Sequence, residues 1–451
     1  MSVTDTTLNL DQIMDDAKLG RVQLTVLLLA TMVTALEGFD LLAIAFAAPV
    51  MAKQWDMGPE ALGILFGMGP VGLAFGALLL APLGDRIGRK PTILLCMAIM
   101  GISTLLSGFA QNYTQLLILR IGIGLGMGGA TPCLETITAE FSSNRFRNLF
   151  ISVVTNGFMV GAIAGGAASA LLIENFGWQS IFIIGGSASL LFMLPIWLYL
   201  PESIHFMARS EQPQVRQQLL NILRKIEPAL DIQEINQLPV APQPPQKLSI
   251  LRVLEPMFRT STLFMWLAFF CYFYCLYTLM QWLPTILSNN GFTNNQAIMA
   301  GTLLSVGGAV GSLLLGALTS RENLRPAILW FFLISTLVMA MMGPALSNLI
   351  QIMAAIFLAG FFINGAGVGL FMLAARFYPS DRRATGIGWC SVFGRLGAVT
   401  GPVVAGYLVG AQLDWHWFFL LLSVVPLLSF FGTLRVKFDG NPAAIPAAIN
   451  S

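Results

Sequence analysis

Charged side chains are scarce in this chain. Asp, Glu, Lys and Arg make up 10% of its 451 residues, whereas hydrophobic residues make up 56%. A soluble domain carries about 25% charged residues, so the composition excludes an ordinary soluble protein. Apolar stretches of about 20 residues, each long enough to cross a bilayer, recur along the whole chain. The sequence therefore predicts a membrane protein.

Histidine and cysteine are also few. The two histidines, His205 and His416, fall on predicted opposite faces of the membrane, and the sequence shows no cluster of His and Cys ligands for a metal. The five cysteines lie inside apolar runs, and an odd set of this kind argues against a disulfide framework. The sequence also shows no nucleophile–base pair and no nucleotide-binding loop. We therefore expect no enzymatic activity, no metal or cofactor, and no nucleic-acid partner.

The apolar runs predict twelve transmembrane helices, because a barrel strand needs only about 10 residues of alternating polarity. The first 21 residues are polar and lack a cleavable signal, so the first run is expected to stay as a helix. The predicted helices span 22–48, 60–83, 92–110, 114–139, 150–173, 178–200, 260–287, 294–319, 326–344, 348–374, 385–409 and 415–434. The predicted fold is an all-α membrane protein with two pseudo-symmetric six-helix bundles, 22–200 and 260–434, a central loop, 201–259, and tails, 1–21 and 435–451.

Lys and Arg in the connecting segments predict the orientation, because cytoplasmic segments are enriched in them. With the N-terminus inside, the outer segments contain only Lys53. The inner segments contain Arg86, Arg89, Lys90, Arg145, Arg147, Arg209, Arg216, Arg224, Lys225, Lys247, Arg252, Arg259, Arg321, Arg325, Arg376, Arg382, Arg383, Arg435 and Lys437. We therefore expect a multi-pass protein of the cell inner membrane with both termini cytoplasmic, working as a monomer. The central loop is expected to be a flexible connector, although VRQQLLNILRKI (215–226) has an amphipathic pattern.

The two halves of the chain resemble each other. Two separate alignments give nearly equal offsets of 235 and 236 residues: APLGDRIGRKP (81–91) with GALTSRENLRP (316–326), and RNLFISVVTNGFMVGAIAG (147–165) with RATGIGWCSVFGRLGAVTG (383–401). In the second alignment Gly161 meets Gly397. The agreement indicates duplication of a six-helix unit, and repeats of this kind build transporters with the substrate site near the membrane midplane.

At this point the chain resembles the major facilitator superfamily over essentially its full length. The signature GDRIGRK between the second and third predicted helices matches at Asp85, Arg86, Gly88, Arg89 and Lys90. Ala81 replaces the usual leading glycine, and the second copy has Ser320 in place of the acid. The resemblance implies that Asp85, Arg86, Gly88 and Arg89 form a cytoplasmic gate that controls alternation rather than contacting substrate.

Within that superfamily, the stretch EGFDLLAIAFAAP (37–49) is similar to the Asp-Gly-(Phe/Tyr)-Asp motif of the aromatic acid:H⁺ symporter family. Further matching segments are RIGIGLGMGGATP (120–132), LPES (200–203), WLPTIL (282–287), RATGIG (383–388) and GRLGAVTGP (394–402). Glu37 replaces the first Asp of the motif, which lengthens the side chain by one methylene. Glu135 stands where a neutral residue is expected.

Charged residues at bilayer depth cost about 2.5–3.5 kcal/mol each and usually have a function. The residues of this kind are Glu37, Asp40, Arg120, Glu135 and Arg395. At 1.5 Å per helical residue, Asp40 and Arg120 lie roughly 12 Å and 9 Å below the outer surface, which predicts an ion pair. Glu37 lies one turn deeper on the same helix face. Two such carboxylates resist being ionised together, so Glu37 or Asp40 is expected to carry the coupling proton.

Arg395 is predicted to lie roughly 15 Å deep, at the midplane. Its counterpart in the repeat is Met159, so the cation does not belong to the shared scaffold. A guanidinium can bind a carboxylate through two parallel hydrogen bonds, which makes Arg395 a candidate for substrate binding, with Arg120 as the competing candidate. The structural alternative is a set of internal ion pairs. We interpret Glu135 as a charge near a helix end.

The seventh predicted helix is rich in aromatic residues. Tyr272 and Tyr274 could stack on an aromatic ring and bind a ring hydroxyl. They point in different directions around the helix, and most of these aromatic residues are expected to face lipid or the membrane boundary. Tyr272 and Tyr274 are therefore minor substrate-binding candidates.

The favoured function is a proton-coupled symporter that imports an aromatic carboxylate such as benzoate or a hydroxybenzoate by alternating access, with protons as the coupling ion. The alternatives are a symporter for a non-aromatic organic acid or a ring-opened dicarboxylate such as muconate, and a receptor that does not transport. A dicarboxylate would recruit both Arg120 and Arg395, whereas a monocarboxylate needs one of them.

Overall fold

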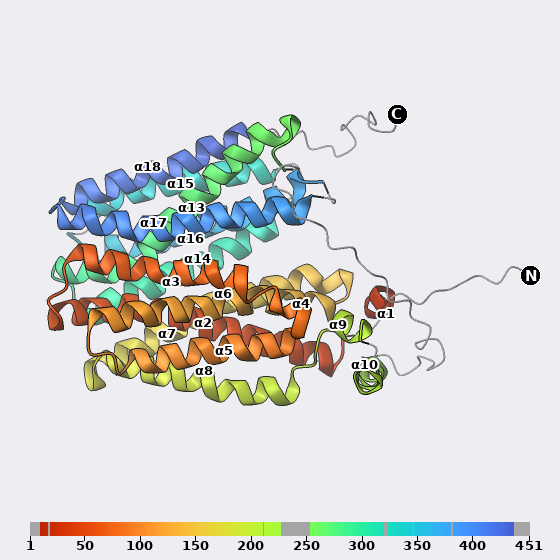
Figure 1. Ribbon diagram of the computed structural model, residues 1–451. Helices are drawn as coiled ribbons and strands as arrows, with labels where there is room; N and C mark the ends of the chain where they lie inside the picture. Colours follow the sequence, from red (N-terminus) through yellow and green to blue (C-terminus); the bar gives the residue numbers. More distant parts are fainter. Residues whose placement is uncertain are drawn as a thin grey trace, which may run out of the picture. The chain divides into compact units, whose positions relative to one another are not determined.

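The computed structural model describes residues 10–16, 19–210, 212–226, 253–319, 323–345, 347–379 and 382–436. Within these residues the regular structure is entirely helical. The helices are α1 (Leu10–Asp16), α2 (Arg21–Gln54), α3 (Pro59–Leu79), α4 (Leu83–Ile87), α5 (Arg89–Ser107), α6 (Tyr113–Glu140), α7 (Asn144–Phe176), α8 (Gln179–Tyr199), α9 (Ile204–Ala208), α10 (Pro213–Ile226), α13 (Pro256–Asn289), α14 (Asn294–Leu318), α15 (Leu324–Ala345), α16 (Leu349–Phe377), α17 (Arg383–Gly410) and α18 (Trp415–Arg435) (Figure 1). Ser320 and the proline-rich part of the central loop lie outside the described residues.

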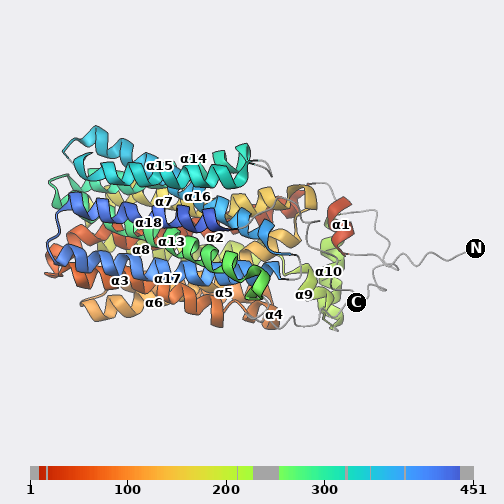
Figure 2. The same ribbon diagram turned by 90° about the horizontal axis from the view of Figure 1, so that it is seen from above.

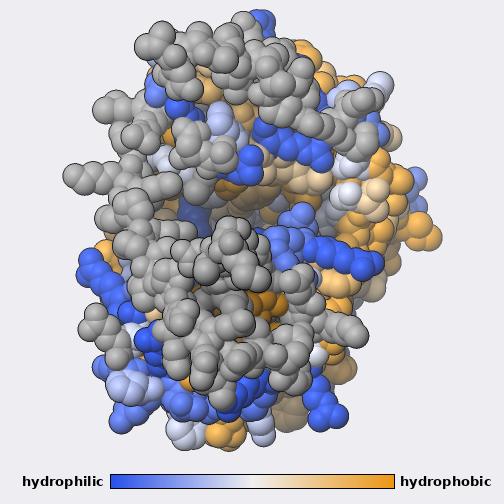
Figure 3. Space-filling model, turned by 90° about the vertical axis from the view of Figure 1, so that its right-hand side faces the viewer, coloured by the Kyte–Doolittle hydropathy of each residue, from blue (hydrophilic) through white to orange (hydrophobic). Residues whose placement is uncertain are grey.

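Twelve helices of the described chain are long and apolar enough to cross a membrane. They are α2, α3 with α4, α5 to α8, and α13 to α18, and they confirm the predicted all-α class with twelve spans. Large apolar side chains such as Leu171, Leu191 and Met341 are exposed on these helices, as expected where lipid replaces water. Seen from the end that carries α1, α9 and α10, hydrophilic residues gather on the face and hydrophobic residues appear at its edge (Figure 3).

The helix ends differ from the predicted ranges. The helix predicted over 60–83 stops at Leu79, and the short helix α4 follows it after a turn. The first span continues to Gln54, six residues beyond its predicted end. Hydropathy marks the apolar part of a helix, whereas the backbone continues until its last hydrogen bonds are met by a turn or cap.

The packing divides the chain into two compact units, each built from several segments. Unit 1 comprises the described residues within 1–41, 71–165 and 179–246, and unit 2 those within 42–70, 166–178 and 247–451. Three helices therefore change unit along their length: α2 after Leu41, α3 after Pro70 and α7 after Gly165.

The predicted duplication is visible in how the helices cross. In unit 1, a Cβ on Gly161 of α7 would overlap the carbonyl oxygen of Ala35 on α2. In unit 2, a Cβ on Gly397 of α17 would overlap that of Phe270 on α13. Gly161 and Gly397 are the pair that the sequence repeat aligns, and small residues permit such close backbone approach. The structure thus confirms two pseudo-symmetric bundles.

A second crossing repeats in the same way. Gly72 of α3 packs on the carbonyl of Ile121 in α6, and Gly307 of α14 packs on that of Phe357 in α16. Residues at the second crossing follow their counterparts by 235 and 236 residues, the offsets found in the sequence. The repeat therefore extends through both helix pairs of each half.

Three short helices lie together beyond the ends of the long helices of unit 1 (Figures 1 and 2). Ile13 and Met14 of α1 belong to the same apolar cluster as Leu219 and Leu223 of α10 and Met207 of α9. The amphipathic pattern over 215–226 thus forms a helix that buries its apolar face. The sequence did not predict α1, because a single turn of buried side chains in a polar tail gives no periodic signal.

The hairpin end is the end of the helices at which α2 joins α3, α13 joins α14 and α17 joins α18. There, within unit 2, segments from both sequence halves pack together. The ring of Phe66 on α3 meets that of Trp282 on α13 edge-on at 5.5 Å, and the Trp282 indole donates to the carbonyl of Pro402 at 3.0 Å. Glu174 on α7 accepts a hydrogen bond from Asn295 on α14 at 2.8 Å. Unit 2 is closed at the hairpin end.

Candidate functional site

Two carboxylates of α2 are buried in unit 1. The exposed fraction is 3% for Glu37 and 0% for Asp40. They lie three residues apart, so they are neighbours on one face of the helix. Removing an ionised carboxylate from water is costly unless hydrogen bonds or opposite charges compensate, and the partners of each carboxylate therefore matter.

Arg120 of α6 is also fully buried and lies against α2. Its Nη1 donates to the carbonyl oxygen of Asp40 at 3.1 Å, and its Nη2 donates to that of Leu41 at 3.4 Å. The structure brings Arg120 to the level of Asp40, as the predicted depths require. The contact is nevertheless made with the main chain rather than with the carboxylate.

The two carboxylates accept hydrogen bonds from threonines instead. Asp40 Oδ2 accepts from the Thr104 hydroxyl of α5 at 3.1 Å, while Asp40 Oδ1 has no hydrogen-bond partner in the described chain. The Thr131 hydroxyl of α6 lies 3.1 Å from Oε2 and 3.3 Å from Oε1 of Glu37. It also lies 2.9 Å from the carbonyl of Met127. Neither carboxylate is neutralised by a direct ion pair within the described residues, so each can bind a proton.

Glu135 is half-buried one turn beyond Thr131 on α6, and it interacts electrostatically with Glu37. This places a third carboxylate in the neighbourhood of the α2 pair. The interpretation of Glu135 as a charge near a helix end therefore stands beside an electrostatic contact that the sequence did not predict.

The remaining predicted substrate residues belong to unit 2. Arg395 lies half-buried on α17. Tyr272 on α13 is buried, with its ring against Gly367 of α16. Tyr274 is half-buried one turn before Thr278, whose hydroxyl donates to the Tyr274 carbonyl. The two tyrosines point to different sides of α13, as the sequence predicts, and their role in substrate binding stays a prediction.

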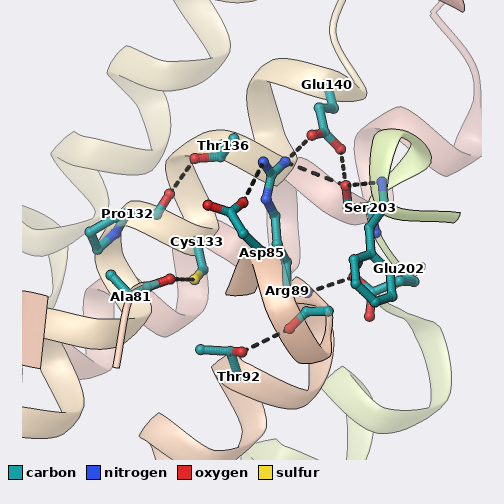
Figure 4. A network of polar contacts seen from close by, with 12 residues as sticks. Ala81, Asp85, Arg89, Thr92, Pro132, Cys133, Thr136, Glu140, Glu202 and Ser203 are labelled. Carbon is teal, nitrogen blue, oxygen red and sulfur yellow. Dashed lines mark hydrogen bonds and ion pairs between the residues drawn. The ribbon is translucent and has the colours of Figure 1, made fainter. Parts of the chain in front are cut away.

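The predicted gate residues form a polar network at the α4 end of unit 1 (Figure 4). The Arg89 guanidinium pairs with Glu140 at the end of α6 and approaches Asp85 of α4 at 3.8 Å. The Ser203 hydroxyl donates to Glu140 at 2.7 Å. The network thus ties α4, α5, α6 and the segment before α9 together, while Arg86 is exposed.

Gly88 makes the junction between α4 and α5. Its φ of 103° and ψ of 153° fall in a region that is essentially restricted to glycine. A Cβ at this position would overlap the Glu202 carboxylate. That carboxylate accepts from the backbone N–H groups of Arg89 at 2.8 Å and Lys90 at 3.2 Å, so it compensates the free N–H groups at the start of α5.

The sequence analysis assigned no role to four residues of these networks. Thr104 and Thr131 gave no usable signal, because a threonine in a membrane helix can satisfy its hydroxyl on its own backbone. Glu140 and Glu202 gave a weak one: both are acids at predicted helix ends on the side rich in Lys and Arg. The family resemblance noted LPES (200–203) without showing that Glu202 anchors α5.

Comparison with known proteins gives a consistent result. A family model described as Major Facilitator Superfamily matches residues 29–372 and again 265–447. The 4-hydroxybenzoate transporter PcaK of Pseudomonas putida is 32% identical over 415 residues, covering 91% of this chain and 91% of that protein. The gallate transporter of Pseudomonas putida is 30% identical and covers 95% and 94%, and the benzoate transport protein of Acinetobacter baylyi is 28% identical and covers 93% and 91%.

Among solved structures, the chain resembles a bacterial homologue of the human lysosomal transporter Spinster in an inward-facing and unoccupied conformation. The TM-score is 0.72, with coverage of 94% of this chain and 100% of that one. At 17% identity the likeness concerns the fold alone.

Proposed function

Because this chain belongs to the Major Facilitator Superfamily, and within it to the aromatic acid:H⁺ symporter family, we propose that it imports an aromatic carboxylate together with protons by alternating access. It is a multi-pass membrane transporter. Benzoate and 4-hydroxybenzoate are the first candidate substrates, because relatives carry these names. The proposed location is the inner membrane, with both termini in the cytoplasm.

The observation that supports proton coupling is the state of Glu37 and Asp40. Both are buried, both accept a hydrogen bond from a threonine, and neither has a direct ion pair within the described residues. A buried carboxylate without a paired cation gains from binding a proton. Asp40 keeps one oxygen without a partner, which leaves room for a proton and its acceptor.

Transport of an anion into a negative-inside cell needs such a device. Moving one elementary charge against the membrane potential costs about 2.3 kcal/mol per 100 mV. One co-transported proton per monocarboxylate makes the cycle electroneutral, and two make it electrogenic inward. In this proposal Glu37 and Asp40 carry the protons, and Arg395, with Arg120 as the competing candidate, binds the carboxylate.

The test is uptake of labelled benzoate and 4-hydroxybenzoate into proteoliposomes, with and without an inward proton gradient. We expect gradient-driven accumulation that Asp40→Asn or Glu37→Gln reduces at least tenfold. Asp414→Asn is the matched control, because Asp414 caps α18 outside the membrane and an asparagine can still accept from the His416 N–H.

Other outcomes separate the alternatives. Accumulation of muconate or another acid instead of the two aromatic acids would keep the transporter and overturn the aromatic substrate. Accumulation that ignores the proton gradient would overturn the coupling. Ligand binding without net flux would identify a receptor.

A further inference from the structure

Gln281 on α13 is fully buried in unit 2, and both polar atoms of its amide, Oε1 and Nε2, lack hydrogen-bond partners within the described chain. An unsatisfied buried polar group typically costs about 1–3 kcal/mol. Buried polar groups are satisfied in most proteins, and each exception calls for a partner that binds at another stage. A fully buried amide with a free donor and a free acceptor is such an exception.

Thr285 lies one turn further along the same face of α13. It is 4% exposed, and its hydroxyl also lacks a partner. Other threonines in these helices, such as Thr278 and Thr302, donate to the carbonyl four residues earlier, which is the usual solution within a helix. The Thr285 hydroxyl is therefore a second free polar group beside the Gln281 amide.

The internal repeat shows that Gln281 is not required by the scaffold. With the offset of 235 residues, the counterpart of Gln281 is Phe46 of α2. Phe46 packs its ring against Gly301 of α14 and Gly166 of α7. An aromatic ring thus fills this position in the first copy, whereas the second copy has an amide with nothing to bind.

These two residues lie at the closed hairpin end. The adjacent residue, Trp282, contacts Phe66 of α3 and the carbonyl of Pro402 on α17. Alternating access requires contacts between helices of the two sequence halves to break and form again. The cost of burying Gln281 and Thr285 is then met in the state in which the hairpin end opens and a ligand reaches them.

We propose that Gln281 and Thr285 form an uncharged subsite for a hydroxyl group on the ring of the transported aromatic acid. The inference rests on the proposed function and narrows its substrate class from aromatic carboxylates to hydroxylated ones. A hydroxyl donates and accepts at once, so it satisfies the Gln281 carbonyl oxygen and amide nitrogen or the Thr285 hydroxyl. A carboxylate would leave the acceptor oxygen of the amide unsatisfied, and an unsubstituted ring would satisfy neither group.

The test measures binding of benzoate and of 2-, 3- and 4-hydroxybenzoate to the purified full-length protein, with Gln281→Leu and Thr285→Val as variants. A site built to bind a hydroxyl discriminates strongly against an analogue that lacks it. We expect the wild type to bind at least one hydroxybenzoate tenfold or more tighter than benzoate. Each variant should reduce that ratio to threefold or less, mainly by weakening the hydroxylated ligand.

Ser335→Ala is the matched control. Ser335 on α15 is another fully buried hydroxyl without a partner in unit 2, and removing it should leave the ratio unchanged. Thr285→Val nearly preserves side-chain volume, so it tests the inference even if Gln281→Leu does not fold.

The outcomes separate the two proposals. A wild type that binds benzoate and the hydroxybenzoates equally, or variants that keep the wild-type ratio, would overturn the subsite alone. A wild type that binds none of the four acids would overturn the aromatic substrate, and the subsite with it.

Discussion

Arg120 is a permanent cation with no exposed surface, and its guanidinium is shared between two consecutive carbonyl oxygens of α2. Carbonyl dipoles stabilise the charge without consuming the carboxylate of Asp40. The planar, fixed spacing of the two terminal nitrogens suits this double contact. Arg120 therefore fixes α6 against α2 at the level of the carboxylate pair.

Replacing Arg120 by lysine keeps the charge but removes the fork. We expect Arg120→Lys to destabilise the protein by about 1–3 kcal/mol, because one of the two carbonyl contacts is lost in a buried site. The measurement is the apparent unfolding midpoint of the purified protein in detergent. An unchanged midpoint combined with a large loss of substrate affinity would instead assign Arg120 to substrate binding.

The Thr131 hydroxyl is the hydrogen-bond partner of Glu37. Hydrogen bonds to charged groups contribute about 1.5–3 kcal/mol, so Thr131→Val should alter how readily Glu37 takes up and releases its proton. We expect gradient-driven uptake to fall about tenfold or more. Thr131→Ser retains the hydroxyl and should keep most of the activity. Equal uptake by the two variants would contradict a role for this contact.

The sequence predicted the charged residues of the site but not their partners. Glu37, Asp40 and Arg120 stand out because a charge in an apolar run is rare. Thr104 and Thr131 do not stand out, because nothing in one sequence tells a threonine bonded to its own helix from one that reaches across to another. The same limit explains Arg120, whose depth was predicted while its main-chain acceptors were not.

Among the helices, the junction of α4 and α5 depends on Gly88. An alanine there must adopt a conformation that non-glycine residues rarely adopt, which costs about 1–3 kcal/mol. Its Cβ would also overlap the Glu202 carboxylate that anchors the start of α5. We expect Gly88→Ala to lower the apparent unfolding midpoint and to slow transport.

Gly388→Ala provides the control for this substitution. Gly388 lies within α17, and no atom would come within 4 Å of a Cβ added there. Alanine is favoured over glycine in a helix by up to about 1 kcal/mol, so the midpoint should stay the same or rise. A similar loss in both variants would show that the Gly88 backbone conformation is not the cause.

Hydropathy predicted the spans better than their ends. The twelve apolar runs correspond to the twelve membrane-spanning helices because 20 apolar residues have no other stable arrangement in a bilayer. The ends are set by local contacts such as the Asn112 cap of α6, whose side chain accepts from the Gln115 N–H at 3.0 Å. The short helix α4 escaped prediction for the same reason.

In unit 2, the closed hairpin end predicts how transport can be stopped. Glu174 and Asn295 come from different sequence halves, are exposed, and are hydrogen-bonded. Cysteines at both positions, joined by a short bifunctional thiol reagent, should hold this end closed. We expect crosslinking of Glu174→Cys/Asn295→Cys to abolish proteoliposome uptake and reductive cleavage to restore it.

The single-cysteine variants treated in the same way serve as controls. The five native cysteines are free and buried in the structure, so they should react slowly with the reagent. Full uptake by the crosslinked protein would show that opening of the hairpin end is not part of the cycle.

The shared apolar cluster of α1, α9 and α10 also has a consequence for biosynthesis. α1 leaves the ribosome before the first membrane span, whereas α10 follows the sixth. At about 5–20 residues per second, roughly 10 to 40 s of translation separate the two helices. During this interval Ile13 and Met14 lack part of their apolar surroundings, so the N-terminal half reaches its final packing only after α10 has been made.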